Sequence, residues 1–301
     1  EFSQSWLFFW DKLERFNYNL NCIIETKGFL VDSEIVRHIL ADPISDGGQW
    51  DMIVNLVEKY GLIPKCCYQE TFHSSRSAEM NKLLNLKFRK SVVELRKSET
   101  PIAVKQQIMK DVYKLLCCFL GTPPETFEWE YYNKDKKYHK MKEMTPKKFY
   151  EEHVDFKFKD YVCVIHDPRQ IGDDGKMDTG FKKIYTVKYL GNVLGGRPVK
   201  YLNVDIDVIK DLVKKTIEKN EAVWFGCDVG QHLNRKRCAM DFDLVDYSNV
   251  VKTDLHMSKK DRLLHKQSLM THAMCITGFN RVGEKFDKWQ IENSWGKSDA
   301  A

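Results

Sequence analysis

A histidine and an asparagine near the end of the chain, His272 and Asn293, are the residues whose types and spacing could do chemistry. Two short apolar segments with strand-forming residues flank the sequence Arg-Val-Gly-Glu at positions 281–284, whose glycine suits a left-handed turn position. A hairpin centred on this turn would place His272 directly opposite Asn293. The spacing therefore predicts a hydrogen-bonded histidine–asparagine pair across two antiparallel strands.

Such a pair suits nucleophilic catalysis by a cysteine. An imidazole that exchanges a proton through one ring nitrogen needs a fixed acceptor for the other, and an amide oxygen supplies it without adding charge. The imidazolium in turn lowers the pKa of a neighbouring thiol. Trp295 could cover the hydrogen bond and exclude water. From spacing alone, however, a structural histidine and a strand end followed by a turn remain equally open.

The cysteines show no pattern of a disulfide framework or a metal site. There are nine, an odd number that includes two vicinal pairs, and most lie in apolar stretches, so we expect reduced, buried thiols in the cytosol. No CxxC is present, and His265 and His272 are too far apart in sequence for a helical metal-binding pair. We expect no metal and no cofactor. The cysteines are at positions 22, 66, 67, 117, 118, 163, 227, 238 and 275.

Composition and charge indicate a globular protein with no membrane span. The 301 residues carry a net charge of +5, from 48 basic and 43 acidic residues, which does not by itself imply a nucleic-acid partner. No apolar run approaches the ~18–20 residues that a bilayer requires. The chain opens on a helix-like pattern without a leader, and we expect the natural N-terminus to lie upstream.

Seven lysines cluster within residues 134–148. A solvated surface is the ordinary explanation for such a cluster. Nucleic-acid binding is the alternative, because Tyr131, Tyr132 and Tyr138 could stack on bases beside the basic side chains.

The elements that must position His272 and Asn293 are predicted next. Along the chain, the pattern indicates mainly helices in the N-terminal part and strands in the C-terminal part. Apolar residues recur at helical spacing over the first sixty residues, over 71–120 and over 205–219. Short β-forming runs occur at 222–227, 273–279 and 288–292. We therefore predict an α+β fold with a helical part at 1–70, a helix-and-loop insertion at 71–200 and a β-containing part at 201–301.

The motifs resemble those of the bleomycin hydrolase family of papain-like cysteine peptidases. THAM at 271–274 and ENSWG at 292–296 are similar to the family's histidine and asparagine motifs. Further similar blocks occur in the family's order along nearly the whole chain. They are EFSQSWLFFWDKLER at 1–15, DGGQWDMIVNLVEKYGLIPK at 46–65, GTPPETFEWEY at 121–131, EAVWFGCDVG at 221–230 and SLMTHAM at 268–274.

The resemblance implies a fold and residue roles. The fold would have two lobes, one helical and one β-barrel-like, with a large helical insertion. His272 would be the general base and Asn293 would orient it, while Gly47 and Gly48 would line the substrate cleft and bind an extended peptide through their backbone. Thr271, Ala273 and Trp295 would also border this cleft. The resemblance further implies a cytoplasmic homohexamer with aminopeptidase activity on peptides or amides and no cofactor.

One part of the family pattern is missing from the chain. The family's nucleophile lies at a helix N-terminus in a context like Gly-x-Cys-Trp, and none of the nine cysteines has this context. We therefore expect the nucleophile upstream of residue 1, and we expect this stretch alone to be inactive. The terminal arm that restricts the family to free N-termini is also not found. The alternative is a non-catalytic papain-like scaffold that lost its nucleophile and binds peptides or nucleic acid.

Overall fold

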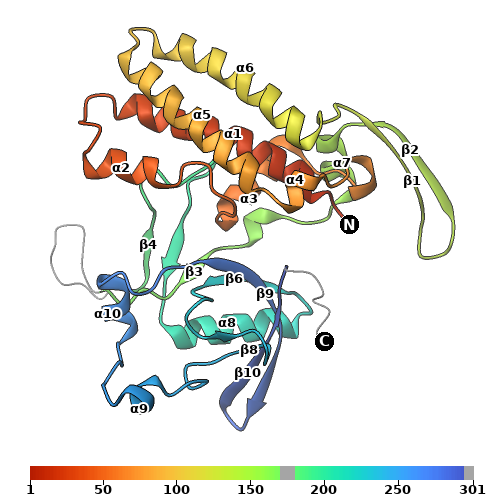
Figure 1. Cartoon of the computed structure of the whole chain (residues 1–301). Coiled ribbons are helices and arrows are strands. Elements are labelled where there is room, and N and C mark those ends of the chain that lie inside the picture. Colours follow the sequence, from red (N-terminus) through yellow and green to blue (C-terminus); the bar gives the residue numbers. More distant parts are fainter. Residues whose placement is uncertain (170–179, 295–301) are drawn as a thin grey trace. The chain divides into compact units, whose positions relative to one another are not determined.

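The computed structural model describes residues 1–169 and 180–294, and it divides into two compact units (Figure 1). The first unit comprises Glu1–Tyr161 and Thr186–Lys200. The second comprises Val162–Tyr185 and Tyr201–Ala301. The chain therefore passes from the first unit to the second, returns for a short segment, and then completes the second unit.

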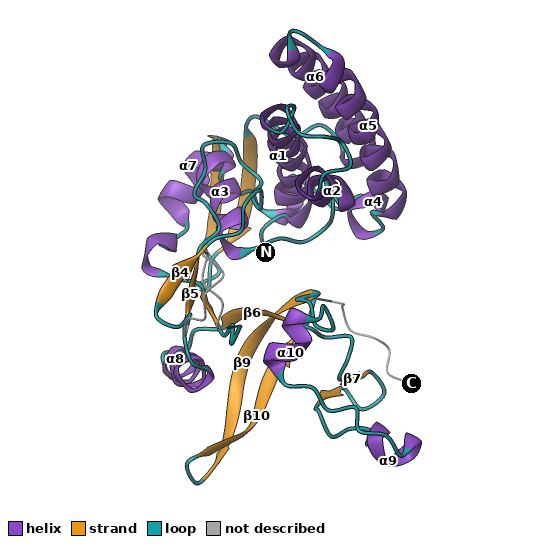
Figure 2. Ribbon diagram, turned by 90° about the vertical axis from the view of Figure 1, so that its left-hand side faces the viewer, coloured by secondary structure: helices purple, strands orange, loops and turns teal. Residues whose placement is uncertain are grey.

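The first unit is mainly helical, and its long helices α1, α5 and α6 pack against one another (Figures 1 and 2). Their apolar stripes meet in a core whose largest side chains include Phe9, Phe16 and Phe88, all fully buried. The helices are α1 (Gln4–Glu25), α2 (Glu34–Ala41), α3 (Trp50–Tyr60), α4 (Phe72–Ser75), α5 (Ala78–Lys97), α6 (Pro101–Leu120) and α7 (Pro146–His153), with short 3-10 turns η1 (Lys65–Cys67) and η2 (Phe158–Asp160).

Glycine and proline residues mark the ends of several helices in the first unit. Gly61 follows α3 with a φ of +69°, and a Cβ at this position would lie 2.2 Å from the Pro146 carbonyl oxygen, so only glycine fits. Gly121 ends α6 in a similar left-handed conformation. Thr145 caps α7 by accepting a hydrogen bond from the Lys148 amide at 3.2 Å, and Pro146 is the first helical residue.

A β-hairpin, β1 (Phe127–Tyr132) and β2 (Tyr138–Met144), extends from the first unit (Figure 1). It was not predicted, although the alternation of aromatic and acidic residues in FEWEYY is a strand pattern and burial in β1 indeed alternates. A second cluster of buried side chains joins the base of this hairpin to α1, α3 and α7 through Phe127, Trp6 and Phe149.

The second unit contains the sheets that carry the candidate site. Strands β6 (Val223–Cys227), β9 (His272–Val282) and β10 (Lys285–Glu292) form an antiparallel sheet in the order β10-β9-β6, against which α8 (Ile206–Glu218) packs. The other elements are β3 (Val164–Ile165), β4 (Lys183–Tyr185) and β5 (Tyr201–Asn203) in the order β3-β5-β4, the pair β7 (Leu233–Asn234) and β8 (Ala239–Met240), and helices α9 (Tyr247–Val251) and α10 (Lys259–Leu264).

The predicted α+β class is confirmed, and the predicted helices and C-terminal strands are present. Within the described residues, the strands of the second unit do not close into a barrel. None of the described helices is both long and apolar enough to cross a bilayer.

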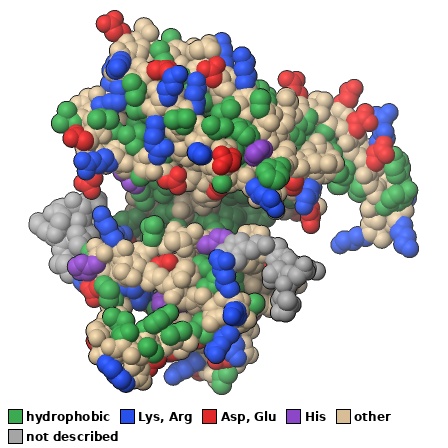
Figure 3. Space-filling model, viewed as in Figure 1, with side chains coloured by type: hydrophobic (Ala, Val, Ile, Leu, Met, Phe, Trp, Pro, Cys, Tyr) green, Lys and Arg blue, Asp and Glu red, His purple; other side chains and the backbone are tan. Residues whose placement is uncertain are grey.

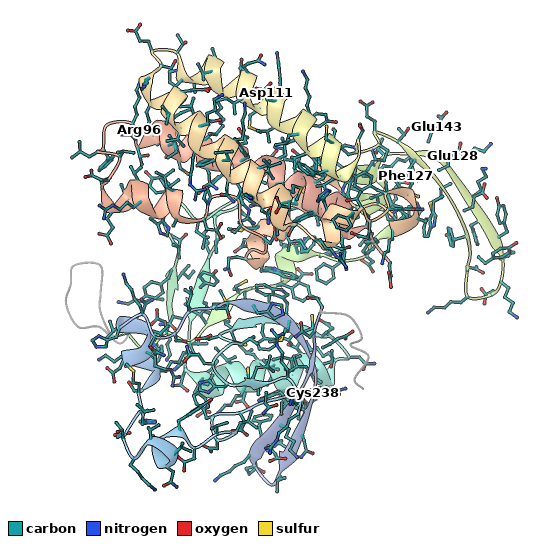
Figure 4. The ribbon with its side chains drawn as sticks, viewed as in Figure 1. Arg96, Asp111, Phe127, Glu128, Glu143 and Cys238 are labelled. Atoms are coloured by element: carbon teal, nitrogen blue, oxygen red, sulfur yellow. The ribbon has the colours of Figure 1, made fainter. Side chains whose placement is uncertain are left out.

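The expectation that most cysteines are buried is wrong. All nine are free, but only Cys22 is buried, while Cys66, Cys118 and Cys238 are exposed. Cys238, labelled in Figure 4, lies on the turn between β7 and β8. An apolar neighbourhood in the sequence does not bury a thiol when the residue lies on the outer face of its element.

Candidate active site

His272 and Asn293 are joined by a hydrogen bond in the second unit. His272 is the first residue of β9, Asn293 directly follows β10, and the distance from His272 Nε2 to Asn293 Oδ1 is 2.9 Å. Both residues are half-buried. Because the amide oxygen can only accept, it selects the imidazole form that is protonated on Nε2. The nitrogen suited to exchanging a proton with a nucleophile is then Nδ1.

The predicted strand register is wrong, although the contact it predicted is present. The turn residues are Gly283 and Glu284, with Val282 paired to Lys285, so the turn lies one residue later than expected. Only Gly283 of the two has a positive φ, +60°, which fits a turn of type II′. Glu292 pairs with Cys275, and Asn293 would therefore lie opposite Met274 rather than His272.

The contact between His272 and Asn293 is still formed because the observed register differs from the predicted one by two residues, an even number. His272 lies two positions before Met274, so it is a diagonal neighbour of Asn293 on the same face of the sheet. Two bulges intervene: Asp287 is the extra residue in β10 and Thr277 is the extra residue in β9. One bulge alone would turn Asn293 to the opposite face, whereas one in each strand restores the alignment.

Strand β6 supports His272 from the other side of β9. Cys227 at the end of β6 is the cross-strand partner of His272, and Gly226 is the partner of Ala273. Beyond the paired strands, the Thr271 amide donates to the Cys227 carbonyl at 3.0 Å, and the Thr271 hydroxyl accepts from the Val229 amide at 3.2 Å. Thr271 thus fixes the entry of the chain into β9, immediately before the histidine.

The carboxylate of Asp228 holds the loop that leads to His272. It accepts hydrogen bonds from the Ser268 hydroxyl at 3.0 Å and the Leu269 amide at 3.3 Å, and also from the Gln231 side chain. The sequence pattern placed Cys227 in a predicted strand and the block at 221–230 in a family motif, but it predicted neither positioning contact. A signal was available, because a charged residue directly after an apolar, partly buried strand needs a hydrogen-bond partner.

Cys227 does not have the properties of a nucleophile. Burial raises the pKa of its thiol above the ordinary value, and the negative charge of Asp228 raises it further. A catalytic thiol requires the opposite shift, toward the thiolate. Cys227 is therefore best interpreted as a neighbour that packs beside His272.

Gly47 and Gly48 lie in the first unit, in the loop before α3. A different physical reason requires glycine at each of the two positions. Gly47 has a φ of +78°, in a region that side chains disfavour. At Gly48 a Cβ would lie 3.0 Å from Met52 Sδ and 3.2 Å from Arg15 Nη2, so the absent side chain permits close packing. The conformation at Gly47 and the close packing at Gly48 therefore each account for a glycine at that position.

Polar side chains of α1 bind this loop through its carbonyl groups. Arg15 donates to the Gly47 carbonyl at 2.6 Å while paired to Asp11, and Lys12 donates to the Ser45 carbonyl at 2.8 Å and to the Asp46 carboxylate at 2.5 Å. Lys12 is fully buried, and burial lowers the pKa of its ammonium although Asp46 opposes that shift. Burial alone would raise the pKa of Asp46, but Lys12 together with hydrogen bonds from Ser77 and Asn81 lowers the pKa of this carboxyl below its ordinary value.

The other predicted site residues are Thr271, Ala273 and Trp295. Ala273 lies in β9 beside His272, and Thr271 is exposed directly before it. Trp295 lies outside the described residues. The predicted lysine cluster is divided among the hairpin tip, β2 and α7, and basic side chains gather at the end of the hairpin (Figure 3). In β2, Lys140 is paired with Glu128 at 3.4 Å and with Glu130.

The helical first unit, the sheet of the second unit and the histidine–asparagine pair together define a peptidase of the papain-like class. A model of the Peptidase C1-like family matches residues 1–301, and the chain belongs to this family. The resemblance inferred from the sequence motifs is thereby confirmed, and with it the class of cysteine peptidases.

The similar proteins are longer than this chain. Bleomycin hydrolase of Rattus norvegicus and aminopeptidase C of Listeria innocua are each 43% identical to it, over 99% of this chain and 67% of their own length. The crystal structure of PepW from Lactobacillus rhamnosis superposes with a TM-score of 0.91 at 44% identity, covering 98% of this chain and 66% of that one. The chain thus spans about two thirds of the relatives it matches.

Proposed function

We propose that the protein containing this chain is a cysteine-type aminopeptidase that hydrolyses peptide or amide bonds, with His272 as general base and Asn293 as the residue that orients it. The observation that carries the proposal is the 2.9 Å contact between His272 Nε2 and Asn293 Oδ1. The names of the similar proteins, bleomycin hydrolase and aminopeptidase C, support the substrate class.

The hydrogen bond gives each ring nitrogen of His272 its own task. With Nε2 held by Asn293, Nδ1 takes the thiol proton and the resulting ion pair maintains the thiolate. The thiolate attacks the carbonyl carbon, and Nδ1 returns the proton to the leaving amine. A water molecule, deprotonated by the same nitrogen, then hydrolyses the thioester and regenerates the thiol. Asn293 adds no charge in any of these steps, so the imidazolium pairs with the thiolate alone.

The nucleophilic cysteine of this proposal belongs to a segment outside residues 1–301. Of the nine thiols, the one nearest His272 along the sheet is Cys227, whose pKa is raised rather than lowered. Cys22 lies toward the C-terminal end of α1, and burial raises the pKa of its thiol to about 12. The relatives have about a third of their length beyond the match, which leaves room for the missing residue.

Substitution of the two residues in the full-length protein tests the proposal. We expect His272→Ala to lower kcat/KM for an aminoacyl substrate by at least ~10²–10⁴-fold, because the general base is lost. Asn293→Ala should lower it less, by about 10–100-fold, the effect of removing one hydrogen bond to a charged group. Steady-state kinetics measure both. Unchanged activity of the His272 variant would refute the assignment.

Gly47 and Gly48 are proposed to bind an extended peptide through their backbone. The carbonyl groups of residues 44, 45 and 47 are occupied by Lys12 and Arg15, which holds the loop in one conformation. A preorganised backbone of this kind suits recognition by strand addition. From the family resemblance we also propose a cytoplasmic location and a homohexameric assembly. Sedimentation of the full-length protein would measure its oligomeric state.

A further inference from the structure

Two adjacent thiols, Cys66 and Cys67, are in contact on the surface of the first unit. Their Sγ atoms are 3.9 Å apart, which is well beyond the ~2.05 Å of a disulfide bond. Both residues belong to the 3-10 turn η1, in which the Cys67 amide donates to the Pro64 carbonyl at 2.9 Å. Cys66 is exposed and Cys67 is half-buried.

The surrounding contacts hold this turn in place. Buried Tyr68 follows it and donates from its hydroxyl to the Leu120 carbonyl at 2.7 Å. The Cys67 thiol donates to the carbonyl of Glu128, labelled in Figure 4 at the start of the hairpin, at 3.4 Å. Because the turn is anchored on both of these elements, the convergence of the two thiols is set by the fold.

The second vicinal pair of the chain shows that adjacency alone does not bring thiols together. Cys117 and Cys118 lie in the last turns of α6. Neighbouring residues of an α-helix point in different directions, so these two side chains diverge. The chain thus contains a convergent vicinal pair and a divergent one, with similar exposure to solvent.

The separation of the two sulfur atoms fits a single soft centre bound to both. A soft centre bonded to two sulfurs at ~2.3 Å each can bridge sulfurs up to about 4.6 Å apart. The observed separation of 3.9 Å lies within that range.

The environment favours a centre that needs only two protein ligands. Among the described residues, no group of three or more His, Cys, Asp or Glu side chains could hold a metal ion. Cys66 borders an open depression in the surface, which is also lined by the charged residues Glu1, Lys65 and Glu70 and by Pro64, Gln69 and Trp129. This space, with an aromatic wall, accommodates an organic substituent on the bound centre.

We propose that Cys66 and Cys67 form a dithiol site for soft, thiophilic centres, and that monosubstituted trivalent arsenicals are the chemical class that fits it. In the reaction, R–As=O combines with two thiols to give R–As(SCys)₂ and one water molecule. Two As–S bonds form, both thiol protons leave with the arsenical oxygen, and no oxidation state changes. The third bond of arsenic is to its own substituent, so no further protein ligand is needed.

Phenylarsine oxide is the probe that tests the site. Full-length protein is treated with it and then with excess glutathione, and intact mass spectrometry counts the groups that remain. We expect one retained phenylarsenic group, released by 2,3-dimercaptopropanol. Trypsin cuts after Lys65 and Arg76, so the adduct should map to peptide 66–76, which contains no other cysteine.

Serine variants provide the matched controls. Cys66→Ser and Cys67→Ser should each abolish retention, because a monothiol adduct exchanges with glutathione. The double variant C117S/C118S should retain the group as the unsubstituted protein does. Loss of retention in the unsubstituted protein, or mapping to another peptide, would overturn the proposal. The mapping needs no variant, so the outcome does not depend on whether Cys67→Ser folds.

Discussion

At the level of single residues, the loop that carries Gly47 and Gly48 shows how a polar interior can serve a functional backbone. Lys12 and Arg15 lie on α1, whose apolar stripe builds the main core, yet both side chains are buried and directed to the loop. A buried ammonium is unfavourable without partners. Lys12 has three hydrogen-bond partners, which are two backbone carbonyls and the Asp46 carboxylate. These three bonds hold the loop against α1.

The substitution Asp46→Asn should lower the thermal stability of the protein by an amount that depends on pH. The folded-state pKa of Asp46 is lowered relative to the unfolded chain, so its contribution to stability is present above the unfolded-state pKa and is lost as the pH falls through the folded-state pKa. Because the carboxylate is 46% exposed, we expect the variant to lose only about 2–4 °C of Tm at neutral pH.

Thermal unfolding monitored by circular dichroism at several pH values checks this prediction. The difference in Tm between the two proteins should shrink as the pH falls through the range in which Asp46 becomes protonated. Asp42→Asn, on the exposed part of the same segment, serves as the control and should leave the pH profile unchanged. A difference that stays constant down to the lowest pH would contradict the role assigned to the Asp46 charge.

At the level of elements, the hairpin of β9 and β10 positions the proposed catalytic pair through two compensating bulges. Each bulge alone would turn Asn293 away from His272, and both together keep the two residues on one face. Gly278 lies next to the Thr277 bulge and pairs with Gln290, where a Cβ would lie 2.8 Å from Gln290 Oε1 and 3.3 Å from its Cβ.

Gly278→Val should therefore lower activity without touching a reacting group. The branched side chain would displace Gln290 and shift the end of β10, and a displacement of ~1 Å in a catalytic group can reduce the rate about 100-fold. We expect kcat to fall by ~10–100-fold in the full-length protein while KM changes little. Steady-state kinetics give both constants.

The double variant G278V/Q290G is the discriminating control, because it exchanges the large and small members of the pair. It should recover part of the lost activity, whereas Gly28→Ala, where a Cβ would meet nothing within 4 Å, should not change activity. No recovery in the double variant would show that Gly278 does not act through Gln290.

At the level of the whole molecule, the chain contains two of the three proposed catalytic residues. The family match covers residues 1–301, but the relatives extend beyond it by about a third of their length. A polypeptide of residues 1–301 should therefore not hydrolyse an aminoacyl substrate, whereas the full-length protein should. Thiol-dependent hydrolysis by residues 1–301 alone, abolished by substituting one of its nine cysteines, would place the nucleophile within this chain.

The sequence by itself determined the class of protein, the long helices and the candidate pair. The blocks that resemble the family are contiguous, helix stripes repeat locally, and Gly61 and Gly121 end helices through their own backbone preferences. His272 and Asn293 could be predicted because both lie at the far ends of one hairpin, where the spacing of the strands limits the possible partners.

Only the tertiary structure decided what depends on contacts between distant residues or on small shifts in register. The bulges at Thr277 and Asp287 follow from the observed strand pairing; Gly278 beside Thr277 is a sequence signal for a bulge, but it fixes neither the second bulge nor the register. The burial of Lys12 against the loop, and the convergence of Cys66 and Cys67 beside the divergent pair in α6, likewise follow from how neighbouring elements hold the backbone. A residue's type states what chemistry it can do, and the fold determines which partner it meets.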